Sequence, residues 1–321
     1  MVPARTMMRR AMTLVATPLL YTALVTACQQ TPPPPRAVDN TMAQPAFAKQ
    51  QQDWRAERLQ DLIKPDGWAS LIGLEVLEPG AHHVGSAADN DIRLALGPAH
   101  LGVLAVGKDA LTFTPEPGVA VTVDDAPAQG TITLRDDTAP EGASRIGFDG
   151  GKGVATVIMR AGGDRLRVKH ADAETRVDFA GLDYWPGGPD WQVKARFIPN
   201  PEGKTMPIAN VIGSTDEMAN PGVLEFQHGG KTFRLEAFDE GEGSLFLVFA
   251  DRTSGHGSYG AGRFMHAPFP DAQGNVLMDF NQAYNPPCAF TPFATCPLPP
   301  PENRLDLAIE AGEKAYAKSA H

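Results

Sequence analysis

The chain lacks a basic cluster and, beyond its N-terminus, lacks any hydrophobic run long enough to cross a membrane. Lysine and arginine number 28 against 38 aspartate and glutamate, which gives a net charge of -10. Phosphate backbones require a basic stripe, so the sequence argues against nucleic acid as a partner. The hydrophobic content of 42% is normal for a globular protein.

The N-terminus predicts export followed by lipid attachment. Arg5, Arg9 and Arg10 precede an apolar run that ends in Val25-Thr26-Ala27-Cys28. This run is short for a membrane span, and it resembles a bacterial lipoprotein signal with its lipobox. Residues 1–27 are then the signal peptide, and Cys28 becomes the acylated first residue of the mature protein.

The segment after the signal predicts a spacer at the membrane surface. Removal of residues 1–27 takes away three arginines and no acid, so the net charge becomes -13. Residues 28–45 contain Pro32 to Pro35 and are expected to form a stiff, proline-rich linker. The expected location is the bacterial cell envelope, with the protein anchored by lipid and facing the periplasm. Gln29, in place of an aspartate linked to inner-membrane retention, favours the outer membrane.

Two folded domains are predicted after the linker, and both are mainly β. Residues 46–178 begin with an amphipathic helix over 47–63, which is expected to pack on the sandwich that follows it. Short β-rich runs separated by Gly, Pro and Asp predict that antiparallel β-sandwich. Residues 179–321 predict a second antiparallel β domain with a hairpin over 232–249 and a C-terminal helix from Glu302 or Asn303 to Lys318.

Part of the first domain resembles the first half of a forkhead-associated domain. The resemblance lies in His83 to Leu94 and in Pro98 to Val103. That family binds phosphothreonine through an arginine directly after a glycine, and Ser86 stands in that position here. A phosphate site without this guanidinium loses its main charge-assisted contact. The resemblance therefore implies a β-sandwich and not phosphopeptide binding.

The segment from Asp279 to Leu305 is rich in proline, aromatic residues and asparagine, and it contains two cysteines. A disordered spacer would be poor in aromatic side chains, which need something to pack against, so this segment is predicted to be ordered. Outside the cytoplasm, Cys288 and Cys296 favour a disulfide, and closing so short a loop contributes roughly 2 to 3 kcal/mol.

Two alternatives for these cysteines stay open. A metal site would need two further ligands, and the spacing of His256 and His266 matches no standard zinc pattern. A thiolate nucleophile would need one free cysteine beside a base such as His256. We predict no metal and no cofactor. The glycine-rich segment 251–264 lacks the features of nucleotide-binding loops, so it is either a tight turn or a functional loop of another kind.

Three phrases of the sequence resemble the domain of unknown function 1684 family, which is found in many bacterial lipoproteins and secreted proteins. They are GWASLIGLEVLEPG, FADRTSGHGSYGAGRFM and DFNQAYNPPCAFTPFATCPLPPPENRL. The resemblance extends from Trp54 to Lys314 and implies a shared site, not a reaction. The residues implied for that site are Asp251, Thr253, Tyr259, Arg263, Asp279, Asn281, Tyr284, Asn285, Cys288, Cys296, Asn303 and Arg304.

Three kinds of function remain open. As a binding module, the protein would hold a small polar or anionic ligand, or a peptide, in a pocket around Arg263, Asp279 and Asn285. As a hydrolase or isomerase, it would use Asp279 or Asp251 as a general base while Arg263 or Tyr259 stabilises developing charge. As a structural envelope protein, it would only pair arginine with aspartate internally. Binding ranks first because catalysis needs a matched acid, base or nucleophile.

Overall fold

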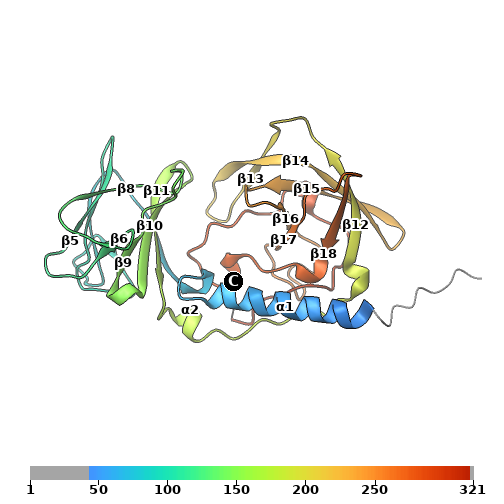
Figure 1. The fold of residues 1–321 in the computed structure, drawn as a ribbon, viewed down its shortest axis with the longest axis horizontal. Helices are drawn as coiled ribbons and strands as arrows, with labels where there is room; N and C mark the ends of the chain where they lie inside the picture. The colour runs from blue at the N-terminus through green and yellow to red at the C-terminus, as the bar shows by residue number, and fades with distance from the viewer. Residues whose placement is uncertain (1–42, 319–321) are drawn as a thin grey trace, which may run out of the picture. The chain divides into compact units, whose positions relative to one another are not determined.

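The computed structural model describes residues 43–318 (Figure 1). The predicted signal peptide, the acylation site Cys28 and nearly all of the predicted linker lie outside the described residues. Within residues 43–318, no helix is both long enough and apolar enough to cross a membrane. The described chain is mainly β, as predicted, and its strands form three sheets.

Helix α1 (Ala43–Ile63) contains the predicted amphipathic helix and begins slightly earlier than expected. It ends shortly before Pro65, because a proline disfavours the α conformation of the residue that precedes it. Gln51 and Arg58 donate side-chain hydrogen bonds to carboxylates of the second β domain. The helix therefore contacts the second domain, which differs from the expectation that it packs on the sandwich.

The first β domain is a sandwich of two sheets, as the spacing of its strands predicted. One sheet has the order β1 (Leu71–Val76), β11 (Gly163–His170), β10 (Gly153–Arg160), β9 (Ile146–Phe148), β6 (Thr122–Val123), β7 (Ala126–Pro127). The other has the order β3 (Ile92–Arg93), β2 (Gly80–Gly85), β4 (Gly102–Val106), β5 (Leu111–Pro115), β8 (Ile132–Leu134). Leu104, Phe113, Phe148 and Leu166 are buried in one shared core, because alternate side chains of each sheet face inward.

The second β domain is one curled, antiparallel sheet. Its order is β17 (Arg263–Ala267), β16 (Leu245–Phe249), β15 (Lys231–Asp239), β14 (Thr215–His228), β12 (Gln192–Pro199), β18 (Asn275–Asp279), and β13 (Thr205–Ala209) pairs with β14. The end strands β17 and β18 contact each other, so the sheet curls back on itself. Strands β15 and β16 form the predicted hairpin, with Phe238 opposite Phe246. Strands β17 and β18 were not predicted.

Short helical turns connect these strands. They are α2 (Glu174–Val177) and 3-10 turns at Trp68–Ser70, Asp149–Gly151, Pro189–Trp191, Phe280–Gln282, Pro287–Ala289 and Pro301–Asn303. Three of the 3-10 turns lie in the proline-rich segment. That segment is ordered, as predicted, because its aromatic side chains find partners: Phe280 packs inside the curled sheet, and Phe290 packs against Tyr316.

Strand β16 separates two cores, because successive side chains of a strand point to opposite faces. One set of its side chains enters the interior of the curled sheet: Leu245, Leu247 and Phe249. The other set packs on the outer face of the sheet, against the loop that carries the two cysteines: Phe246 and Val248. All five side chains of the strand are buried as a result.

The predicted C-terminal helix is wrong. After the turn at Pro301–Asn303, the described chain contains no further helix. The backbone of this segment bonds to distant partners instead of to itself: Leu305 donates to Ala250, and the carbonyl of Leu307 accepts from Arg252. Ile309 is buried in the interior of the curled sheet. The apolar spacing that suggested a helix therefore reflects separate contacts of an extended segment, residues 304–318, which we call the C-terminal strap.

Candidate functional site

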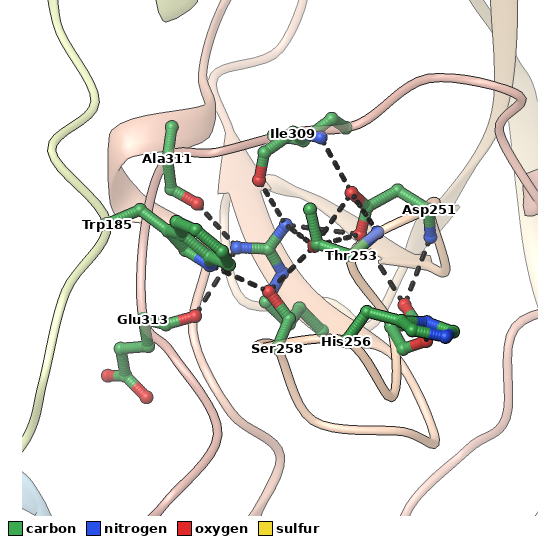
Figure 2. Close-up of polar contacts among 10 residues, drawn as sticks. Trp185, Asp251, Thr253, His256, Ser258, Ile309, Ala311 and Glu313 are labelled. Atoms are coloured by element: carbon green, nitrogen blue, oxygen red, sulfur yellow. Dashed lines mark hydrogen bonds and ion pairs between the residues drawn. The ribbon is translucent and has the colours of Figure 1, made fainter.

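Arg263, the first residue of β17, is completely buried beside Asp251 (Figure 2). Its Nη2 atom lies 3.2 Å from Oδ1 of Asp251 and 3.0 Å from the carbonyl oxygen of Ile309. Its Nη1 atom donates to the carbonyl of Ala311. Burial lowers the pKa of Arg263, and the charge of Asp251 opposes that shift. Protein groups enclose the guanidinium, so a ligand has no access to it.

Asp251 completes this network from the opposite side. Its carboxylate accepts hydrogen bonds from the Thr253 hydroxyl at 2.9 Å and from the backbone N–H of Ile309 at 2.7 Å. The hydroxyls of Thr253 and Ser258 lie 2.8 Å apart, and the indole of Trp185 donates to Ser258 (Figure 2). Arg263 and Asp251 thus bind the carbonyl and the N–H of the same residue, which fastens the C-terminal strap to the sheet.

Asp279, at the end of β18, belongs to a second and separate network. Its Oδ2 atom accepts from the side-chain amides of Gln51 at 2.7 Å and Gln192 at 2.9 Å. Its Oδ1 atom accepts from the backbone and the side-chain amide of Asn281, at 3.0 and 2.8 Å. Amide dipoles therefore satisfy this carboxylate. Asn281 also exchanges two hydrogen bonds with the backbone of Gly188, so its amide faces protein and not solvent.

The remaining predicted residues also serve the framework. The side chain of Asn285 donates to the carbonyl of Lys314 at 2.7 Å. The side chain of Asn303 donates to the carbonyls of β15 and β16 at Glu236 and Val248, so it bridges the two strands where their direct pairing ends. Arg304 donates to the carbonyl of Pro299, and Tyr259 packs in a small apolar cluster with Leu62, Phe290 and Tyr316.

The structure therefore does not bring Arg263, Asp279 and Asn285 together around one open pocket. Asp279 lies in a separate hydrogen-bond network, whereas Arg263 and Asn285 both bond to Glu313, and the bonded polar atoms of all three face protein groups. The physical reason is that the strap and helix α1 cover this end of the curled sheet. The sequence predicted these residues as a ligand site, and the structure shows their polar atoms in hydrogen bonds within the protein.

Two predicted residues, Tyr284 and Cys296, do line a pocket. The cavity has a volume of about 710 Å³, which lies in the range of small-molecule sites. Residues from α1, the sandwich and the curled sheet contribute to its wall. The lining residues that sequence reasoning missed include Arg58, Trp68, Arg167, Phe246 and His266.

Tyr284 and His266 lie against each other in this wall. The tyrosine hydroxyl is 2.9 Å from Nε2 of His266, and Nδ1 of His266 is 3.1 Å from the hydroxyl of Ser244. The outer edge of the imidazole is exposed, but desolvation on its packed side lowers the pKa of His266. Burial raises the pKa of Tyr284. Both shifts favour the uncharged rings at neutral pH, and the tautomer of His266 sets which of the two groups donates.

Arg58 is held in place at the edge of the pocket. Its Nε atom donates to Oε1 of Glu313 at 3.0 Å, and its Nη2 atom donates to the carbonyl of Asn285 at 3.0 Å. Its guanidinium lies 4.6 Å from the ring centroid of Tyr284, which adds a cation–π contact. Burial raises the pKa of Glu313, whereas Arg58 opposes that rise. Helix α1 thereby supplies a positioned cation to the pocket.

Arg167, on β11, is the other notable cation of the pocket. Among residues 43–318, no carboxylate lies within ion-pair distance of it, and its buried Nε atom has no hydrogen-bond partner. Burial lowers the pKa of Arg167 to about 10. The guanidinium lies 5.4 Å from the ring centroid of Trp68. The pocket therefore contains a half-buried positive charge that has no ion-pair partner among the described residues, and Asp137 acts on it only from beyond ion-pair distance.

Cys288 and Cys296 lie at disulfide-bonding distance, with their Cα atoms 6.3 Å apart, as predicted. Both side chains are buried against the outer face of β16 and β17. Pro287, Thr295 and Cys296 also line the pocket, so the bridged loop forms part of its wall. Among the residues that the structure describes, no group of three or more His, Cys, Asp or Glu side chains could hold a metal ion.

Comparison with known proteins places the second domain in a family. Residues 177–314 match the family model described as "Protein of unknown function (DUF1684)". A solution NMR structure of an uncharacterized protein from Haloarcula marismortui is 33% identical, over 44% of this chain and 80% of that one, with a TM-score of 0.38. No curated protein matches the chain.

Proposed function

Since the chain belongs to the DUF1684 family of proteins of unknown function, whose name carries no activity, we propose its function from the pocket and the N-terminal sequence. The protein is a lipid-anchored binding module of the bacterial cell envelope that holds a small polar or anionic ligand. The ligand occupies the pocket beside Tyr284. The lipobox at Cys28 supports the anchor and the periplasmic orientation, and Gln29 favours the outer membrane.

The observation that carries the proposal is the state of Arg167. A partly desolvated guanidinium without an ion-pair partner is unfavourable, and an anionic ligand would supply that partner. Arginine presents a planar fork of donors that matches carboxylate and phosphate oxygens. Trp68, beneath the guanidinium, keeps the fork in a defined orientation through stacking.

Thermal unfolding in the presence of inorganic phosphate tests the proposal, with chloride at equal ionic strength as the reference. A ligand that binds only the folded state raises Tm. We expect phosphate to raise Tm of the parent protein and not of Arg167→Gln. Arg165→Gln is the matched control, because Arg165 lies on the same face of β11 and does not line the pocket. Equal responses of all three proteins would contradict the proposal.

The enzyme alternative finds less support. Asp251 is sealed against Arg263, and both oxygens of Asp279 already accept two hydrogen bonds each, so neither carboxylate is free to take a proton from a substrate. The hydrogen-bonded pair of His266 and Tyr284 is the group in the pocket that favours proton transfer. The sealed pair supports the structural role for Arg263 and Asp251.

A further inference from the structure

The chemical class of the ligand can be narrowed from the wall of the pocket, an inference that rests on the proposed function. Beside its charged and polar groups, the wall contains six large apolar side chains: Trp68, Met159, Ile208, Met218, Phe246 and Phe264. An inorganic ion would leave this surface in contact with water. Covering apolar area contributes about 25 cal/mol per Å² to binding, so the wall favours a ligand with an apolar body. The two methionines can adapt to its shape.

Two cations of this pocket, Arg58 and Arg167, are less exposed than its acids. The side chain of Arg58 is 13% exposed, and Arg167 is half-buried. Two of the nitrogens of Arg58 are engaged by Glu313 and Asn285, while Nη1 has no acceptor among the described residues. Arg160, the third arginine of the wall, is already paired with Asp137 at 2.7 Å. Arg167 is thus the primary partner for an anionic group, and Arg58 adds a second positive charge.

The acids of the same pocket are exposed to solvent. Asp216 follows the start of β14, and Glu240 and Glu242 lie on the turn between β15 and β16. None of the three has a cationic partner within ion-pair distance among residues 43–318. Their negative charge therefore acts on any ligand group that remains near the solvent side. A second anionic group there would meet like charges, which is a common way to reject unwanted ligands.

We propose that the ligand is an amphipathic anion with one negatively charged group, a carboxylate or a phosphate ester, attached to an apolar body. The charged group pairs with Arg167, and the apolar body lies against the aromatic and methionine side chains of the wall. The acidic residues at the solvent side select against a second anionic group. The positive, apolar and negative parts of the pocket thus have separate roles in ligand binding.

Isothermal titration calorimetry with four probes tests this assignment. The full chain is reconstituted in nanodiscs of zwitterionic lipid, and heats from empty nanodiscs are subtracted. Naphthoate carries one charge and an apolar body, naphthamide lacks the charge, acetate lacks the body, and naphthalenedicarboxylate carries a second charge. We expect naphthoate to bind about tenfold more tightly than naphthamide, through the charge-assisted hydrogen bond, and about tenfold more tightly than acetate, through apolar contact.

The dicarboxylate separates the role of the acids from that of the arginine. It should bind more weakly than naphthoate to the parent protein, and Glu240→Gln combined with Glu242→Gln should restore its affinity. Arg167→Gln should lose most of the preference for naphthoate over naphthamide, because only Arg58 remains, whereas Arg165→Gln should keep that preference. Circular dichroism establishes that each variant is folded.

The outcomes distinguish this inference from the proposed function. If phosphate still raises Tm in a manner that depends on Arg167, while naphthoate binds no better than acetate, the amphipathic class is overturned and the anion pocket stands. If the dicarboxylate binds at least as tightly as naphthoate, selection for a single charge is overturned. If neither phosphate nor naphthoate binds, both the inference and the proposed function are overturned.

Discussion

Two completely buried charges, Arg263 and Asp251, lie 3.2 Å apart beneath the C-terminal strap. A buried ion pair often contributes little net stability, because both charges lose their hydration. Removal of one partner is different, since the other charge then stays buried without compensation. The intact pair therefore contributes little to the free energy of unfolding, whereas the loss of one partner lowers it strongly.

We expect Asp251→Asn to lower the free energy of unfolding by about 3 to 5 kcal/mol, because Arg263 remains buried without a counter-charge. Urea denaturation followed by tryptophan fluorescence measures this change. Removing both charges, with Asp251→Leu and Arg263→Met together, should destabilise less than the single variant. Arg234→Gln is the control: it breaks an exposed pair with Glu225 and should cost less than about 1 kcal/mol. A cost that small for Asp251→Asn would contradict the argument.

Among the structural elements, the loop that carries Cys288 and Cys296 links stability to the pocket. It packs on the outer face of the curled sheet and contributes Cys296 to the pocket wall. Because the bridge closes a short loop of the unfolded chain, Cys288→Ser combined with Cys296→Ser should lower the free energy of unfolding by about 2 to 3 kcal/mol. Dithiothreitol should destabilise the parent protein by a similar amount and leave the double variant unchanged. Equal effects on both proteins would rule out a stabilising bridge.

The strands that the sequence predicted are those with clear punctuation. Strands β12, β15 and β16 are bounded by Gly, Pro or Asp and carry β-branched or aromatic residues, so their pattern is readable locally. Strand β17 follows directly on a glycine-rich turn, which hid its start at Arg263. The C-terminal strap was predicted wrongly because it does show a clear local pattern. Leu305, Ile309 and Tyr316 have helical spacing, but the backbone hydrogen bonds of the strap go to distant segments, which no local pattern reveals.

The residues of the hydrogen-bonded framework could be predicted from the sequence, whereas those of the pocket could not. The family phrases identified Asp251, Arg263 and Asp279, because these residues lie inside distinctive local motifs. Arg58 and Arg167 lie on an ordinary helix and an ordinary strand, far apart in the sequence. Only the tertiary fold brings them to one cavity. Sequence reasoning therefore found residues of the framework and missed Arg58 and Arg167, which line the pocket.

For the molecule as a whole, the N-terminal sequence predicts a lipid anchor at Cys28. If the proposed anchor exists, Cys28→Ser should move the protein from the membrane fraction to the soluble fraction, because the acyl chains could no longer be attached. Cell fractionation with immunoblotting measures the change. Gln29→Asp is the matched control, since it preserves the cysteine and should shift the protein toward the inner membrane. Unchanged membrane association of Cys28→Ser would refute lipidation.

Strand β16 has a consequence for how the pocket keeps its shape. Three of its side chains fill the interior of the curled sheet, and the two between them support the bridged loop. Neither layer can be displaced without exposing the other to water, so the two layers open in one cooperative event. The cavity wall should therefore be as rigid as the core of the curled sheet that supports it. The ligand that we propose would meet a surface shaped in advance, and little binding energy would be lost to ordering it.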